Sequence, residues 1–163
     1  TRASVVVSME WNWYDDKTNC WIIPSSTEGL KRKSGDQENH HYIPNTPQLE
    51  TLMNNLSAIN RDQKYVFFSP FKGNFPYVSK QTPNDHLKNL GYKNRQDAHG
   101  FRHVATNALV DIGHKDELMV SRCLGHLKKE GVMRHYNFAK QLDERREIHF
   151  CWNQLLIFEG LRI

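Results

Sequence analysis

Helical spacing of apolar residues fills the last third of the chain and constrains its fold more than any other feature. From Asp97 onward, apolar residues recur every three or four positions, which is the period of an amphipathic helix. Asp97 is expected to cap a first helix and Gly113 to end it. A second helix is expected over 116–124, ending at Gly125, and a long third one over 137–158. The expected apolar stripe of the first helix consists of Ala98, Phe101, Ala105, Ala108, Leu109 and Ile112.

The first part of the chain has a different pattern, with short apolar runs that end at proline. Residues 21–24 and 41–44 are strand-like, and the polar stretch between them is expected to form a long hairpin loop. Residues 3–12 are compatible with a short helix, but the β-branched run Val5-Val6-Val7 favours a strand. The sequence therefore predicts strands before residue 45 and helices after residue 97.

Between these two regions the pattern is mixed. Thr46 followed by Pro47 is a typical helix start, and apolar residues at helical spacing extend that helix to about residue 60. Residues 65–68 are expected to be a buried strand or extended segment, and 83–90 one more helix. Taken together, the elements predict a mainly α protein with a small antiparallel β-sheet, of the α+β class.

Length and composition limit the number of domains and the class of protein that the chain can form. A chain of 163 residues with 38% hydrophobic residues fits a single domain with one core. The sequence has no run of 18 apolar residues, and its three cysteines, which form no CxxC pair, are expected to be reduced thiols. A cytoplasmic location is therefore expected. The sequence begins with Thr1-Arg2 rather than methionine, and we expect it to be a piece of a longer protein.

The chain is mildly basic, with a net charge of +4 and a pI near 9.0. This charge is compatible with a polyanionic partner such as nucleic acid, but many soluble domains are as basic.

Chemistry-bearing residues follow one another at fixed intervals in the helical region. His99 and Arg102 are three residues apart near a helix start, His126 follows Leu124-Gly125, and Tyr136 comes ten residues later. Arginine and histidine can hold the non-bridging oxygens of a phosphodiester, and a tyrosine oxygen can attack its phosphorus. We expect His99 and Arg102 to share a helix face that is not the core stripe. This set of residues needs no metal or nucleotide cofactor.

A metal site is the alternative interpretation of the histidines. His103 lies four residues after His99, but a metalloprotease helix would need glutamate where Gly100 stands, and no third ligand is indicated. Two neighbouring histidines, His40 and His41, are expected to be solvated loop residues or minor DNA contacts.

The motifs together resemble the catalytic domain of the tyrosine recombinases, the phage-integrase family. That family carries His-x-x-Arg at a helix start, then Leu-Gly-His, then the nucleophilic tyrosine about ten residues later. Its first arginine is followed by tryptophan and aspartate at intervals that Arg2, Trp11 and Asp15 reproduce. The segment from Tyr136 to residue 146 resembles integrases of prophages and genomic islands.

The resemblance implies a role for each site residue. Tyr136 is the expected nucleophile, and the residues expected around the phosphate are Arg2, His99, Arg102 and His126. The family's hairpin lysine, proposed as general acid for the leaving 5′ oxygen, is expected at Lys31, with Lys33 as the alternative. Val5 is a departure, because the family usually has glutamate there to orient the first arginine.

The resemblance also implies a biological setting. Residues 1–163 would form the catalytic domain of a site-specific recombinase, without the core-binding and arm-binding domains that precede it in the family. The partner would be double-stranded DNA at attachment sites, bound by a homotetramer of the full-length protein, with an accessory directionality factor and a nucleoid-associated location. No cofactor is expected.

Two other functions remain open on sequence grounds. A type IB topoisomerase has nearly the same catalytic set, and a decayed integrase remnant would bind DNA without cutting it. The apolar C-terminal residues, 155–163, are expected either to pack within the chain or to dock on a neighbouring protomer.

Overall fold

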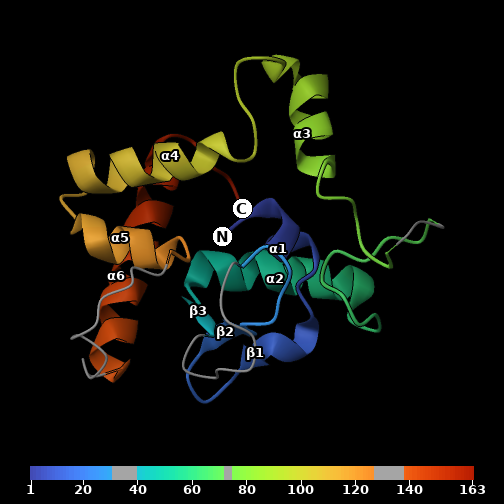
Figure 1. Cartoon of the computed structure of the whole chain (residues 1–163), viewed down its shortest axis with the longest axis horizontal. Coiled ribbons are helices and arrows are strands. Elements are labelled where there is room, and N and C mark those ends of the chain that lie inside the picture. The colour runs from blue at the N-terminus through green and yellow to red at the C-terminus, as the bar shows by residue number, and fades with distance from the viewer. Residues whose placement is uncertain (31–39, 72–74, 127–137) are drawn as a thin grey trace.

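The computed structural model describes residues 1–30, 40–71, 75–126 and 138–163 (Figure 1). Lys31, Lys33 and Tyr136 therefore lie outside the described residues. The elements, in chain order, are α1 (Ala3–Val7), η1 (Trp11–Trp13), β1 (Tyr14–Asp15), β2 (Cys20–Ile23), β3 (His41–Pro44), α2 (Pro47–Asn60), α3 (Thr82–Leu87), η3 (Lys88–Tyr92), α4 (Gly100–Asn107), η4 (Ala108–Ile112), α5 (Glu117–Cys123) and α6 (Phe138–Phe158). The expected combination of helices with a small antiparallel sheet is confirmed.

The sheet has the strand order β1-β2-β3 and is antiparallel throughout. Trp21 lies opposite Tyr14 on one side and Ile43 on the other. Strands β2 and β3 therefore form the hairpin that the sequence predicts. The α2 helix also begins as predicted, because the Thr46 hydroxyl accepts a hydrogen bond from the Leu49 amide at 3.3 Å.

The chain start is a helix, although the valine run favours a strand. The amides of Val5 and Val6 both donate to the carbonyl of Arg2 at 3.0 Å. Val5 and Val7 are 0% and 4% exposed. Burial of these side chains outweighs a propensity difference that is at most about 1 kcal/mol per residue.

One core lies around the sheet and α2. Its buried members are Met9, Trp11, Trp21, Met53 and Val66. The segment that follows α2 is extended, as predicted, and the Val66 amide donates to the Met9 carbonyl at 2.9 Å. A smaller adjacent cluster joins Val5, Ile23 and Leu30.

A second core lies among the C-terminal helices, where Leu109, Val120, Cys123 and Ile148 meet. The buried face of α4 and η4 differs from the predicted stripe. Ala105 and Leu109 are buried, but Phe101 and Ile112 are 47% and 65% exposed. The buried line runs instead through Arg102, Ala105 and Leu109, which are spaced at three and four residues. The widened π-type turn at η4 shifts the helical phase beyond this point.

The long α6 helix connects the two cores. Its Arg146 donates to the Thr18 carbonyl at 3.3 Å, and its Asn153 donates to the Thr46 hydroxyl at 2.7 Å. Figure 1 shows α4, α5 and α6 gathered on one side of α1, α2 and the sheet, with α3 above α1 and α2 in this view. The N-terminus lies between the two groups.

In the described part of the chain, no helix has the length and apolar character needed to cross a membrane. The three cysteines, Cys20, Cys123 and Cys151, carry free thiols.

Candidate active site

Arg102 is a buried arginine in the first turn of α4, and its side chain is anchored at two points. Nη1 donates to the Leu124 carbonyl at 2.9 Å, and Nη2 contacts Nε2 of His126 at 2.8 Å. The residue is 8% exposed. The expectation that Arg102 faces away from the core is therefore wrong, because these two contacts let a charged side chain occupy the buried face of the helix.

His126 lies three residues after the end of α5 and is placed by a glycine turn. Gly125 has a φ of +87°, a conformation that residues with a Cβ rarely adopt. This turn directs the His126 amide to the Ser121 carbonyl at 3.1 Å. Partial burial lowers the pKa of the His126 imidazole, and the positive charges of Arg102 and Arg2 lower it further. The ring is therefore neutral at pH 7.

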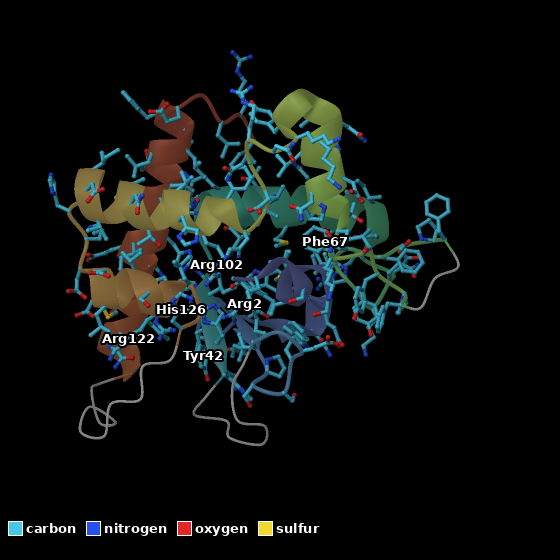
Figure 2. All side chains as sticks on the ribbon, turned by 45° about the horizontal axis from the view of Figure 1, so that its top comes forward. Arg2, Tyr42, Phe67, Arg102, Arg122 and His126 are labelled. Atoms are coloured by element: carbon cyan, nitrogen blue, oxygen red, sulfur yellow. The ribbon has the colours of Figure 1, made fainter. Side chains whose placement is uncertain are left out.

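Arg2 reaches the same place from the start of α1. Its Nη1 donates to the Gly29 carbonyl at 2.9 Å. Burial lowers the pKa of Arg102, and the charge of Arg2 lowers it as well, so the two guanidinium groups are close enough to repel each other. Figure 2 shows Arg2, Arg102 and His126 side by side at the junction between the sheet and the helical group.

No carboxylate among the described residues forms an ion pair with Arg2 or Arg102. Two neighbouring cations without an acidic partner there favour an anion between them. A phosphodiester has the charge and the oxygen geometry that two guanidinium groups bind best.

Val5, which stands where the resembled family has glutamate, has no polar side-chain group with which to orient the Arg2 side chain. It is fully buried in the cluster with Ile23 and Leu30. The Gly29 carbonyl holds Arg2 instead. Gly29 has a φ of +87°, and a Cβ at this position would collide with the Ser4 hydroxyl. Sequence reasoning did not assign Gly29 to the site, and a glycine in a polar loop was the only available signal.

His99 lies at the edge of this group. It is exposed and immediately precedes α4, and its ring packs edge-on against His103 with 5.6 Å between centroids. Its charge contributes only slightly to the lowered pKa of His126. Within the part of the chain that the structure describes, no group of three His, Cys, Asp or Glu side chains is arranged to hold a metal ion.

The structure thus brings Arg2, Arg102 and His126 together and leaves His99 at the periphery. Lys31 and Tyr136 are not tested, since both lie outside the described residues. Trp11 and Asp15, which match the spacing that follows the family's first arginine, make structural contacts. Trp11 is buried in the sheet core, and the Asp15 carboxylate accepts from the Thr18 amide and hydroxyl at 3.0 and 2.6 Å.

Two further residues near the site were missed or misjudged from sequence. Ser121 has its hydroxyl 3.1 Å from Nδ1 of His126, and a serine in a short helix gives no sequence signal for this role. His41 is 0% exposed, with its ring beneath Gly125, so the expectation of a solvated loop residue is wrong. It is buried because β3 places it opposite Ile23 in the sheet.

Comparison with known proteins finds integrases among the relatives of this chain. The chain is 27% identical to the Integrase of Enterobacteria phage P4, over 95% of this chain and 37% of the relative. It is 26% identical to Prophage integrase IntA of Escherichia coli (strain K12), over 96% of this chain and 36% of the relative. It is 26% identical to the Integrase of Shigella phage Sf6, over 93% of this chain and 37% of the relative. The chain is similar to integrases of phages and prophages.

This similarity confirms the resemblance to integrases that the motifs predict. The chain spans a little over a third of the length of these integrases. No model of a protein family matches the chain, and no solved structure matches it.

Proposed function

We propose that residues 1–163 form the catalytic domain of a tyrosine-type site-specific DNA recombinase. The observation that carries this proposal is the meeting of Arg2, Arg102 and His126. These residues come from three distant parts of the sequence, and the resemblance independently assigns all three to one phosphate site. The similarity to integrases supports recombination as the reaction.

The proposed reaction is a phosphoryl transfer from DNA to the protein. Arg2 and Arg102 bind the non-bridging oxygens of one phosphodiester and offset the charge of the transition state, with His126 and His99 alongside. The oxygen of Tyr136 forms a bond to phosphorus, and the bond from phosphorus to the leaving 5′ oxygen breaks. The tyrosine proton passes to a nearby base, and Lys31 supplies a proton to the 5′ oxygen. The product is a covalent 3′-phosphotyrosine that a new 5′ hydroxyl can attack.

The positive site explains how a phenol could react near neutral pH. A free tyrosine has a pKa of about 10, so only about 0.1% is ionised at pH 7. Neighbouring cations stabilise the phenolate and lower its pKa. In the proposed reaction this stabilisation comes from protein side chains, and the chemistry is metal-independent.

The partners follow from the same proposal. The substrate is double-stranded DNA at attachment sites, and the full-length protein acts as a homotetramer on two duplexes, with an accessory factor setting direction. Domains that complete the grip on DNA would belong to the longer protein.

The test uses a nicked suicide DNA substrate carrying the cognate site and the full-length protein. We expect a covalent protein–DNA band on a denaturing gel that Tyr136→Phe abolishes. Tyr92→Phe, which removes the hydroxyl of an exposed tyrosine in η3, is the matched control and retains the band. DNA binding without a band in the wild type would contradict the proposal and favour a DNA-binding remnant.

Relaxation of supercoiled DNA by a type IB topoisomerase is the second function that this residue set could support. The names of the matched relatives favour integration instead. A recombination assay with paired sites separates the two, because a topoisomerase would relax plasmids without joining two sites.

A further inference from the structure

The hydrogen bonds of His126 define which of its ring nitrogens carries a proton. Nε2 lies 2.8 Å from Nη2 of Arg102. A guanidinium group only donates hydrogen bonds, so Nε2 must accept and cannot itself carry hydrogen. The neutral ring therefore carries its proton on Nδ1.

Nδ1 in turn lies 3.1 Å from the hydroxyl oxygen of Ser121. Because Nδ1 carries hydrogen, it donates and the serine oxygen accepts. Ser121 also accepts the His126 backbone amide through its carbonyl at 3.1 Å. One residue thus holds both the backbone and the ring of His126.

Ser121 is itself firmly placed. It lies on α5 between the buried residues Val120 and Cys123. The Asp116 side chain caps that helix by accepting from the Met119 amide at 2.9 Å. A hydroxyl on such a helix can fix the ring direction of a residue that follows a glycine turn.

We infer that Ser121 is a positioning residue that keeps His126 in the Nδ1–H form, with Nε2 directed at Arg102 and the phosphate site. The inference rests on the proposed function for its role in the reaction, but not for the proton position. The ring then presents an accepting nitrogen to Arg102 at the phosphate site, whereas the opposite tautomer would place an N–H group against the Arg102 N–H donor.

The first measurement is the ¹⁵N NMR pattern of the His126 ring in DNA-free protein at a pH where the ring is neutral. We expect the Nδ1–H pattern in the wild type. In Ser121→Ala we expect the Nε2–H form to become populated, whereas Ser121→Thr, which keeps a hydroxyl, retains the wild-type pattern. Ser57→Ala removes a hydroxyl from α2 that bonds the Asn54 carbonyl and serves as the matched control.

The second measurement is the rate of covalent complex formation on the suicide substrate. Ser121→Ala should slow it about fivefold to tenfold, as expected for loss of one hydrogen bond, and Ser121→Thr should restore it. A wild-type ring protonated on Nε2 would overturn the inference without any variant. A Ser121→Ala protein that behaves like Ser57→Ala in both measurements would also overturn the inference.

Failure of the proposed function has a different signature. If the wild type forms no covalent complex, the recombinase proposal fails, and the NMR pattern alone still decides whether Ser121 sets the tautomer.

Discussion

Arg102 is both charged and buried, and two directed hydrogen bonds make this possible. Its guanidinium satisfies the Leu124 carbonyl with one nitrogen and contacts His126 with another. Lysine keeps the charge but lacks the planar fork by which two guanidinium nitrogens reach two separate acceptors.

Arg102→Lys should therefore slow covalent complex formation by about 10²-fold or more, the usual effect of losing one fixed donor in the transition state. The measurement is a single-turnover rate on the suicide substrate. Arg95→Lys changes an exposed arginine stacked on Tyr92 and should leave the rate unchanged. Equal rates in wild type and Arg102→Lys would exclude Arg102 from the phosphate site.

The pKa of His126 is a second residue-level test. Burial and the charges of Arg102 and Arg2 hold it below the 6.5 of an ordinary histidine. An NMR titration should show this lowered midpoint, and Arg2→Gln should raise it by removing one of the charges. Lys93→Gln removes an equal charge from an exposed residue and should not change it. An unchanged midpoint in Arg2→Gln would mean that Arg2 lies elsewhere.

At this scale the sequence indicates members of the proposed site, but not the residues that hold them in place. Arg2, Arg102 and His126 could be selected because their spacings resemble a known family. Ser121 and Gly29 could not, because their roles depend on contacts that exist only in the folded chain. The bond from Arg2 to Gly29, for example, spans 27 residues.

At the scale of elements, propensity and packing disagree in two places. The valine run of α1 favours a strand, but Val5 and Val7 are buried as parts of a helix. In α4 the apolar pattern points to Phe101, whereas the buried face contains Arg102. Strands β2 and β3 and helices α2, α5 and α6 follow their sequence patterns, since there cap residues, prolines and apolar spacing agree with the final burial.

The turn after α5 allows a matched glycine experiment. Gly125 and Gly91 have φ values of +87° and +88°, so alanine at either position should lower the free energy of unfolding by about 1–2 kcal/mol. Gly125 directly precedes His126, and a Cβ there would lie 3.5 Å from Nε2 of His41, whereas a Cβ at Gly91 would meet nothing within 4 Å.

Gly125→Ala should therefore also slow covalent complex formation, and Gly91→Ala should not. Denaturant unfolding and the suicide-substrate assay measure the two effects. Equal rates in the two variants would show that the turn geometry does not position His126.

At the scale of the whole molecule, the proposed site lies where two cores meet. Arg2 belongs to the part built on the sheet, and Arg102 and His126 belong to the helical part (Figure 2). The helix α6 bonds to the sheet side through Arg146 and Asn153. This junction could not be predicted from sequence patterns, because periodicity indicates elements and not how separate cores pack together.

His149 provides a test of the packing of α6 by pH. Burial and nearby positive charge, including that of Arg145, lower its pKa from 6.5 to about 4. Between these values the unfolded chain binds a proton that the folded chain does not. The free energy of unfolding should therefore fall as the pH drops from 6.5 toward 4, by up to about 3 kcal/mol.

His149→Gln does not titrate and should lose less stability over the same range, whereas His86→Gln, at an exposed position of α3, should behave like the wild type. Urea unfolding at several pH values measures the difference. Parallel curves for wild type and His149→Gln would show that His149 is not buried as a neutral ring.

The proposed reaction depends most on the identity of the nucleophile. The direct measurement is to trap the covalent complex on a suicide substrate, digest both protein and DNA, and locate the nucleotide-bearing peptide by mass spectrometry. We predict a 3′-linked nucleotide on Tyr136. A nucleotide on any other residue, or a 5′ linkage, would contradict the proposed mechanism.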